Sequence, residues 1–412
     1  QNARTDNAMK ALKKKMQKEK DSDTKKSQTK EIKTLTAKRN ALKKERDQLD
    51  AAIPRSMVMR ERKEIRPSHI MKRGQYDDPG ELVTRNTPEF LHPLKKKEEL
   101  ATRMDLAEWF VDPLNPLTAR VAVNRFWQQF FGVGLVKTSE DLGAQGDVPS
   151  HPRLLDHLTI SFLESGWDVK ALMKQIVMSK TYRQSSIATP EQFAKDSQNR
   201  LLSRGSRYRM DAEMIRDQIL ATSGLLVGKM YGKSVKPPQP DGLWKSVTMT
   251  GEVFRPDSGD AIYRRSLYSF WKRGMPPPQM TILNAPIRDS CTARRERTNT
   301  SSQALLLLNE SEFLKAARNL ARKTLAIENA DLDQRLDFAY ETVTSKLPDA
   351  KERSILSNLV RNLQATYLNN QSLANELADG IDSANKEEKA ELAAWTVLVN
   401  SLYNLDVTKT RE

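Results

Sequence analysis

NPLTARVAVNRFWQQFF, residues 115 to 131, has the pattern of an amphipathic helix, and this pattern recurs along much of the chain. Asn115 is a typical helix cap, Pro116 suits the first helical position, and Gly132 follows the last periodic residue. Apolar residues at intervals of four, three and four predict a buried stripe of Ala119, Val123, Phe126 and Phe130. A polar row runs beside it through Arg120, Asn124 and Gln128. The sequence therefore predicts a mainly α fold, a body of several helices.

The stretch GDVPSHPRLLDHL, residues 146 to 158, raises the question of a metal site because it contains His151 and His157. These histidines are six residues apart, about 240° around a helix, so they cannot bind one ion from the same helix. We interpret the stretch as a helix start, with Ser150 as its cap and Pro152 in its first turn.

More helices are expected towards the C-terminus. Asp168 has the side chain of a helix cap, and a helix is predicted from about residue 211 to residue 222. Three charged residues form an exposed row on the latter helix and are expected to make buried or half-buried ion pairs: Glu213, Arg216 and Asp217. Residues 301–412 are predicted to be helical, with Pro348 between two helices and a last helix near residues 386–404. Apolar residues recur at intervals of three and four in this last helix and predict its buried face: Leu392, Trp395, Val399 and Leu402.

The composition permits a large core and excludes several kinds of site. Hydrophobic residues make up 38% of the 412 residues. The single cysteine, Cys291, allows no intramolecular disulfide, no cysteine-based zinc site and no C-x-x-C-H attachment of covalent haem. No run of 18 apolar residues could span a membrane. We expect no metal site and no cofactor in this chain.

The formal net charge of +15 is partly local, because residues 1–52 contain 16 basic and 8 acidic side chains. Two charged helices, over residues 5–20 and 29–52 with the polar DSDTKKSQ between them, are expected to form a helical hairpin. Charge runs of this kind are usually solvated, so we favour a solvated arm over one that binds nucleic acid. The first residues show no starting Met and no apolar signal core, which favours a mature form or a fragment.

The chain is expected to divide into five segments. Residues 53–97 contain five prolines and predict an extended strap over a neighbouring surface, followed by a helix from about residue 98 to residue 110. The segments are 1–52, a charged helical hairpin; 53–97, the strap; 98–232, a helical domain; 233–300, an irregular, Pro-rich, partly β insert; and 301–412, the C-terminal helical part of the same domain.

The insert, residues 233–300, carries arginines interleaved with aromatic rings. In RRSLYSFWKR, residues 264 to 273, strand-like alternation predicts Leu267, Ser269 and Trp271 on one face. Guanidinium groups pair with phosphate or sulfate, and rings stack on sugars or bases. This pattern is typical of anionic polymer binding, although the rings also suit a core. The candidate ligand-binding residues are Trp244, Arg264, Arg265, Trp271, Arg273, Arg294 and Arg295.

A second set of candidates comes from the region around the first helices. Polar side chains that catalysis uses occur there, and a shared pocket depends on their convergence in space. These candidates are Arg120, Asn124, Asp141 and His151.

Six segments in one order resemble a known family. They are NPLTARVAVNRFWQQFFGVGLVKTSEDLGAQGDVPSHPRLLDHL, GWDVKALMKQIVMSKTYRQSS, RMDAEMIRDQILATSGLL, DAIYRRSLYSFWKR, RRERTNTSSQALLLLNE and AAWTVLVNSLYNLD. Residues 54 to 412 thereby resemble the planctomycete-specific C-terminal domain of unknown function, the PSD domain. The resemblance implies an extracytoplasmic location, with another domain of unknown function and often a cytochrome c domain upstream. Haem is then expected only on such an upstream domain.

The sequence departs from the family pattern at three places. LNAP, residues 283 to 286, replaces an aromatic-Asp-Ala-Pro motif, so a functional role for the motif's aspartate would be weakened by Asn284. Ser301 and Ser302 replace a Pro-Leu pair, and His157 stands where Trp is common.

Three hypotheses of function follow. The first is a non-catalytic structural or interaction module whose partners are upstream domains of the same polypeptide. The second is a module that binds anionic, sulfated or acidic polysaccharide, with nucleic acid the less favoured polymer. The third is an uncharacterised hydrolase or redox enzyme that uses the polar candidates near His151.

Overall fold

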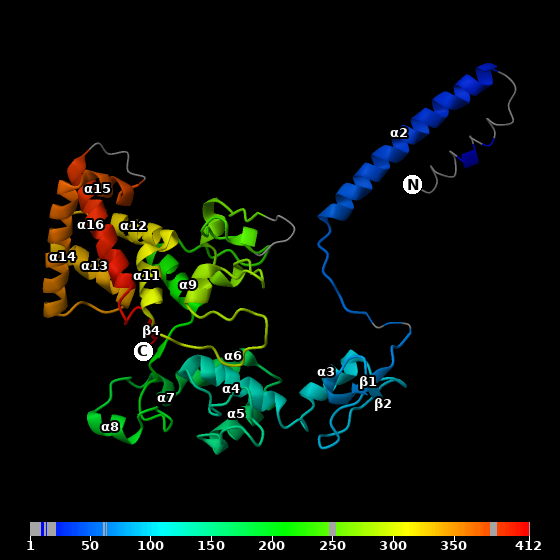
Figure 1. Ribbon diagram of the computed structural model, residues 1–412, viewed down its shortest axis with the longest axis horizontal. Coiled ribbons are helices and arrows are strands. Elements are labelled where there is room, and N and C mark those ends of the chain that lie inside the picture. The colour runs from blue at the N-terminus through cyan, green and yellow to red at the C-terminus, as the bar shows by residue number, and fades with distance from the viewer. Residues whose placement is uncertain are drawn as a thin grey trace. The chain divides into compact units, whose positions relative to one another are not determined.

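The computed structural model describes residues 10, 11, 14, 22–60, 62, 64–246, 253–379 and 385–411. They belong to two compact units, Gln1–Thr87 with Lys96–Asp105, and Pro88–Lys95 with Leu106–Glu412. Across the described ranges the protein is mainly helical, with two small two-stranded sheets, as the sequence predicts (Figure 1).

Helices of very different length alternate with short strands and turns along the chain. The α-helices are α2 Ser22–Ala52, α3 Arg103–Val111, α4 Thr118–Phe131, α5 Pro152–Glu164, α6 Val169–Met178, α7 Lys180–Arg183, α8 Pro190–Lys195, α9 Ala212–Ser223, α10 Pro278–Ile282, α11 Ser301–Asn309, α12 Ser311–Leu325, α13 Leu332–Thr344, α14 Ala350–Asn369, α15 Gln371–Leu377 and α16 Lys386–Tyr403. The strands are β1 Ser68–Met71, β2 Pro79–Val83, β3 Tyr208–Arg209 and β4 Thr410–Arg411. The 3₁₀ turns are η1 Lys72–Gly74, η2 Leu243–Ser246, η3 Gly259–Tyr263 and η4 Ser266–Tyr268.

Helix α2 begins earlier than the sequence predicts. The polar stretch at residues 21–28 was expected to separate two helices, yet α2 starts at Ser22 and includes most of it. This stretch contains neither Gly nor Pro, and Asp23 lies in the first turn, where a negative charge is favourable. Most of the other helix, predicted over residues 5–20, lies outside the described residues.

The segment predicted as an extended strap contains a β-hairpin, which the sequence did not predict. Strand β1 pairs antiparallel with β2, and Ser68 stands opposite Val83. Pro79 opens β2, a position at which proline is tolerated in a strand. The following helix begins at Arg103, later than predicted, because Thr102 exchanges hydrogen bonds with Asp105 at its start.

Helix α4 ends as predicted, but it begins at Thr118, with Leu117 and not Asn115 at the cap position, and its buried face is rotated. The Asn115 side chain accepts hydrogen bonds from the first backbone N–H groups, and Gly132 ends the helix in the left-handed region. Trp127 and Phe131 are fully buried, whereas the predicted Phe126 and Phe130 are only half-buried. The prediction is wrong at these two positions because the neighbouring amide side chains of α4 are hydrogen-bonded inside the core, which makes their burial possible.

Helices α5 and α6 pack with α4 around one apolar core. His151, and not Ser150, occupies the cap position of α5, because the Ser150 N–H donates to the carbonyl of Leu135 and lies outside the helix. Asp168 caps α6 as predicted, its carboxylate accepting from the N–H of Ala171 at 2.9 Å.

The C-terminal helices surround α16, which packs against α12, α14 and α15 (Figure 1). The buried residues of α16 that the sequence predicts are confirmed: Leu392, Trp395, Val399 and Leu402. Pro348 lies between α13 and α14, also as predicted. Strand β3 pairs antiparallel with β4 and so brings residue 208 beside residue 411.

Helix α14 is tied to α13 at its first turn. Asp349 and Glu352 form a capping box, in which each side chain accepts from the backbone N–H of the other residue. The same Glu352 carboxylate accepts the Tyr340 hydroxyl at 2.9 Å. Burial, and then this hydrogen bond, raise the pKa of Tyr340 to about 12.

The insert is irregular, as predicted, but RRSLYSFWKR does not alternate like a strand. The 3₁₀ turn η4 interrupts it, so Leu267 is 70% exposed while Ser269 is buried. The predicted common face of Leu267, Ser269 and Trp271 is therefore wrong. The β contacts of this segment are isolated bridges, such as the one between Val235 and Ser269.

Candidate functional site

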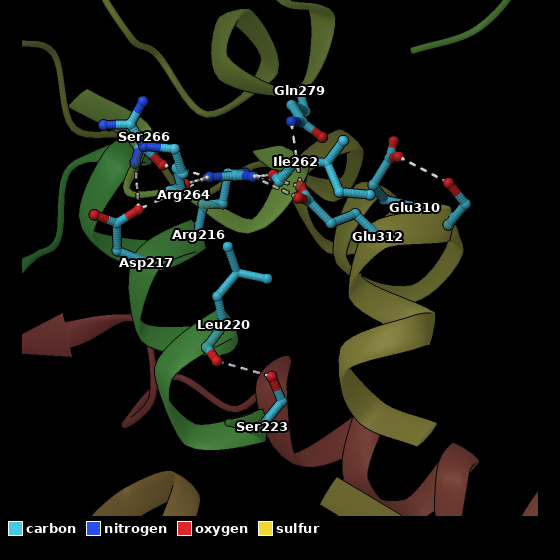
Figure 2. A network of polar contacts seen from close by, with 11 residues as sticks. Arg216, Asp217, Leu220, Ser223, Ile262, Arg264, Ser266, Gln279, Glu310 and Glu312 are labelled. Atoms are coloured by element: carbon cyan, nitrogen blue, oxygen red, sulfur yellow. Dashed lines mark hydrogen bonds and ion pairs between the residues drawn. The ribbon is translucent and has the colours of Figure 1, made fainter. Parts of the chain in front are cut away.

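Arg216 of α9 is fully buried and connects three parts of the chain (Figure 2). Its guanidinium makes a two-point ion pair with Glu312 of α12, with Nε 2.8 Å from Oε2. It also donates to the carbonyls of Arg264 and Ile262 and to the Ser266 hydroxyl. One guanidinium thus joins α9, α12 and the irregular insert.

The prediction for the charged row on α9 is correct about ion pairing and wrong about the exposure of Arg216. Buried ion pairing is confirmed, but Arg216 is not exposed, and its closest carboxylate is Glu312 on another helix. Asp217 accepts the backbone N–H of Ser266 at 2.7 Å, and Glu213 pairs with Arg295. All three charged residues of the row therefore hold the insert or its flank against the helical body.

Two glutamates at the start of α12 have different environments. Glu312 is neutralised by Arg216 and also accepts from Gln279 Nε2 at 3.4 Å. Glu310, at the cap position, is half-buried and lies near the Ser311 hydroxyl (Figure 2). Burial, and then the charge of Glu312, raise the pKa of Glu310 above its usual range. Glu310 therefore holds a proton more readily than an ordinary glutamate does.

Glu310 contributes to a pocket of about 150 Å³, which we call the proline pocket. Five prolines, two phenylalanines and two aliphatic side chains provide most of its wall. The lining residues are Lys236, Pro237, Pro238, Gln239, Pro240, Phe254, Ser269, Phe270, Pro277, Pro278, Gln279, Ile282, Leu306 and Glu310. Ser269 Oγ and Gln239 Nε2 are buried without a hydrogen-bond partner among the described residues.

An aromatic cluster stands beside the proline pocket. The rings of Phe254 and Phe270 lie 5.3 and 6.1 Å from the ring of Trp244. Lys236 lies over the Phe270 ring at 5.0 Å, and Lys272 lies over the Trp244 ring at 4.3 Å. The pocket thus combines apolar walls, a cation and a carboxyl of raised pKa, which suits a small apolar group that carries hydrogen-bonding atoms.

The structure places Arg264 inside the protein. It is 5% exposed, donates to the carbonyls of Lys229, Tyr231 and Lys233, and stacks on the Tyr268 ring at 3.8 Å. This arginine fastens an irregular loop by satisfying backbone acceptors that no helix or sheet satisfies.

The other candidate arginines of the insert face carboxylates or rings. Arg295 hydrogen-bonds to Glu213, and Arg265 lies 3.7 Å from Asp217. Arg273 pairs with Asp289 at 3.1 Å and Arg294 with Glu140 at 3.2 Å, both at exposed positions. Trp244 is buried, and the half-buried Trp271 lies beneath Arg288. The predicted residues are thus distributed over several local contacts, and their binding to an anionic polymer stays a prediction.

Comparison with known proteins identifies the family. The model of PSD1, a protein family of unknown function (DUF1553), matches residues 102–360, which is more than half of the chain. The chain belongs to this family. Its planctomycete-specific domain is the one that the sequence resembles. No curated protein and no solved structure matches the chain.

In this PSD1 member the four polar candidates do not form one cluster of hydrogen bonds. Arg120 pairs with Asp156 at 2.8 Å, and Asn124 exchanges hydrogen bonds with the backbone of Val136. Asp141 accepts from the N–H of Gly143, and His151 Nδ1 lies 3.1 Å from Ser150 Oγ. Within the described ranges, no hydrogen bond or ion pair joins any two of the four.

Asn284 occupies a left-handed backbone position with φ of 64°. Asn and Asp both tolerate this conformation better than most residues. Its amide also donates to the Thr298 hydroxyl. The local backbone is therefore compatible with Asn as well as with Asp.

Two kinds of feature are missing from the described residues. No group of three or more His, Cys, Asp or Glu side chains there could hold a metal ion. Among the same residues, none of the helices is both long enough and apolar enough to cross a bilayer.

Sequence reasoning missed Glu310, Glu312 and the proline pocket. The available signals were two acidic residues at the start of a strongly amphipathic helix and the runs KPPQP, residues 236 to 240, and MPPPQM, residues 275 to 280. Neither signal shows that the two runs, far apart in sequence, line one pocket with Glu310.

Proposed function

We propose that this PSD1 chain is a non-catalytic interaction module of an exported multidomain protein and that the proline pocket receives an apolar group of its partner. One observation carries the proposal. The candidate arginines of the insert are engaged within the protein, Arg264 with backbone carbonyls and the others with carboxylates, whereas the insert itself supplies most of the pocket wall.

The arrangement of side chains supports a binding role. Arg216 and Glu312 neutralise each other where α9 and α12 meet the insert. Arg264 holds the loop around Lys229 that leads into the insert. A pocket with rigid proline walls needs little ordering when a ligand enters, which lowers the entropic cost of binding. The unpartnered Ser269 hydroxyl and Gln239 amide at the pocket give a partner polar atoms to pair with.

The family context adds the partner and the location to the proposal. The partner is another domain of the same polypeptide, upstream of this chain, and the location is extracytoplasmic. No cofactor is assigned to this chain, and any haem belongs to an upstream domain. A C-x-x-C-H motif in the upstream reading frame would support this part of the proposal, and the lack of any upstream domain would count against it.

A pocket-blocking variant tests the interaction. Ile282 lines the pocket and is 38% exposed, so Ile282→Trp fills the opening without removing a buried side chain. Ile287, also in the insert and 48% exposed, lies outside the lining and provides the matched control Ile287→Trp. Calorimetric titration with the separately expressed upstream part should show at least tenfold weaker binding for Ile282→Trp and unchanged binding for the control. Equal binding by both variants would contradict the proposal.

The polysaccharide hypothesis predicts a different result. Binding to sulfated polysaccharide is measured as retention on a sulfated polysaccharide column across a salt gradient. Neutral polysaccharide and DNA columns provide the comparison. Arg265 is exposed and Arg264 is buried, so Arg265→Glu changes surface charge with less damage to the fold than a change at Arg264. Selective retention on the sulfated column that Arg265→Glu abolishes would favour polysaccharide binding over the interaction module.

One observation favours a second candidate function, acid or base catalysis. A carboxyl whose pKa is raised in an apolar pocket is typical of general acids, and Glu310 has this environment. Such an enzyme would be a hydrolase that protonates a leaving group. Turnover of a chromogenic glycoside or ester that disappears in Glu310→Gln would establish it, and absence of turnover in wild type would leave the interaction module as the better proposal.

A further inference from the structure

A second pocket, of about 120 Å³, lies at the C-terminal end of α4, and arginines dominate its charge. We call it the arginine pocket. Three arginines line it, Arg200, Arg207 and Arg297, together with serine and amide residues whose side chains can donate hydrogen bonds. No Asp or Glu is among its lining residues, all of which lie in described ranges. It shares no lining residue with the proline pocket.

Two of the arginines are fixed by backbone carbonyls. Arg200 donates from Nη1 to the carbonyl of Gly134 and from Nη2 to that of Leu135, each at 2.9 Å. Arg297 donates to the carbonyl of Gly132 at 2.8 Å and stacks on the Tyr208 ring at 4.5 Å. A guanidinium has five N–H donors, so these bonds fix the orientation of each group while other donors remain available.

Gly132 is required for this arrangement. Its φ is +80°, and a Cβ atom there would lie 2.9 Å from Cδ1 of Tyr208 and 3.2 Å from Nη1 of Arg297. A side chain at this position would displace both groups from the pocket wall. The backbone at the end of α4 is therefore shaped to let Arg297 and Tyr208 approach closely.

The carboxylates around the arginine pocket lie outside its lining. Arg207 pairs with Asp406 at 2.7 Å, and Arg297 Nε lies 3.7 Å from Asp211. Arg297 Nε is itself buried and makes no hydrogen bond within the described part of the chain. Burial raises the pKa of Tyr208 to about 12, so its hydroxyl adds no negative charge at neutral pH. Asp196, whose carboxylate accepts from the backbone N–H of Arg200 at 2.7 Å, is a third carboxylate near the pocket, and like the other two it lies outside the lining.

We propose that the arginine pocket binds a sulfate or phosphate group. Oriented guanidinium groups pair with the oxygens of such an anion, often at two points, and Ser206 and Gln198 add neutral donors at the pocket wall. The absence of carboxylates from the lining excludes a cationic ligand by the same electrostatics. This site is independent of the interaction that the proline pocket makes.

Calorimetric titration of the full chain with sodium sulfate, at constant ionic strength in sodium chloride, tests the proposal. Wild type should bind one sulfate saturably. Ser206 lines the pocket and is half-buried, so Ser206→Glu places a negative charge there and should weaken sulfate binding at least tenfold. Ser197 is nearby in sequence, exposed and outside the lining, so Ser197→Glu should leave binding within twofold of wild type.

Other results would overturn the proposal. They are non-saturable binding by wild type, or sulfate binding by Ser206→Glu within twofold of wild type. If circular dichroism shows that Ser206→Glu does not fold, Arg207→Gln replaces it, because Arg207 is 51% exposed and its removal spares the core. Arg207→Gln should weaken sulfate binding at least threefold, and unchanged binding would equally overturn the site.

Comparison of three ligands on the same chain shows whether the arginine pocket prefers a free anion or a sulfate ester. Inorganic sulfate, inorganic phosphate and glucose 6-sulfate share the oxyanion but differ in charge and in the attached group. Tighter binding of glucose 6-sulfate than of inorganic sulfate would assign the pocket to a sulfate ester, and equal or weaker binding would assign it to the free anion.

Discussion

The insert and the C-terminal helices reach a fixed conformation by different means. In the C-terminal part, capped helices satisfy their own backbone groups and bury apolar side chains, such as Phe313 and Leu320, completely. The insert has short 3₁₀ turns and isolated bridges, and guanidinium groups from its own and neighbouring segments satisfy its carbonyls. Where no ladder of backbone hydrogen bonds exists, arginine side chains donate hydrogen bonds to the backbone carbonyls instead.

Arg216 joins the two regions, so its removal has the largest expected effect. Arg216→Met leaves the Glu312 charge buried without its partner and should lower the free energy of unfolding by about 3–5 kcal/mol. Urea unfolding followed by circular dichroism measures this change. The exposed pair of Arg273 and Asp289 provides the control, since Arg273→Gln should cost at most about 1 kcal/mol. Similar losses in the two variants would show that burial of the pair is unimportant.

Arg264→Met sharpens the comparison by acting on the insert alone. It removes charged donors from the carbonyls of Lys229, Tyr231 and Lys233, and such hydrogen bonds contribute about 1.5–3 kcal/mol each when they cannot be replaced by water. These residues are exposed, so water replaces part of the loss and we expect about 2 kcal/mol in total.

Hydrogen exchange locates the effect of Arg264→Met. Amides of residues 227 to 235 should exchange faster, while those of α16 keep their protection, because the two regions are stabilised separately. Arg265→Met, at the exposed neighbouring position, is the control and should leave both regions unchanged. Faster exchange throughout α16 would mean that the insert and the helices form one cooperative unit.

The smallest expected effect is a pH dependence of the free energy of unfolding, which arises from Glu310 where α12 meets the insert. The pKa of Glu310 is raised in the folded state, so its stabilising contribution is full below the ordinary glutamate pKa and is lost as pH rises above it. Glu310→Gln should therefore be more stable relative to wild type at about pH 7 than at about pH 4. Urea unfolding at the two pH values measures the difference. The exposed Glu328→Gln is the control, and an equal dependence on pH in both variants would contradict the assignment.

Local sequence signals predicted the helices well. Asp168 and Pro348 lie in their expected positions. Asn115 accepts from the first N–H groups of α4 as expected, although the cap position itself is at Leu117. The apolar period of α16 likewise predicted its buried face. Such features depend on residues within one or two helical turns, so the sequence contains the information directly.

Other features depend on contacts between distant segments and could not be predicted. Arg216 was expected at the surface because nothing local shows that Glu312, 96 residues away, lies opposite it. The aromatic and basic alternation of residues 264–273 resembles a strand, but contacts with Arg216 and Asp217 hold it in a 3₁₀ turn. For the same reason the proline pocket, built from separate runs, has no sequence motif of its own.

The two carboxylate oxygens of Glu352 make different contacts, one within the first turn of α14 and one with α13. Oε2 closes the first turn of α14, and Oε1 accepts from Tyr340 of the preceding helix. Fraying of that turn would therefore also break the hydrogen bond to Tyr340 of α13. The first turn of α14 thus opens only together with the loss of its contact to α13. Residues 332–369 should in consequence behave as one folding unit, whose helices appear and disappear together when the chain folds and unfolds.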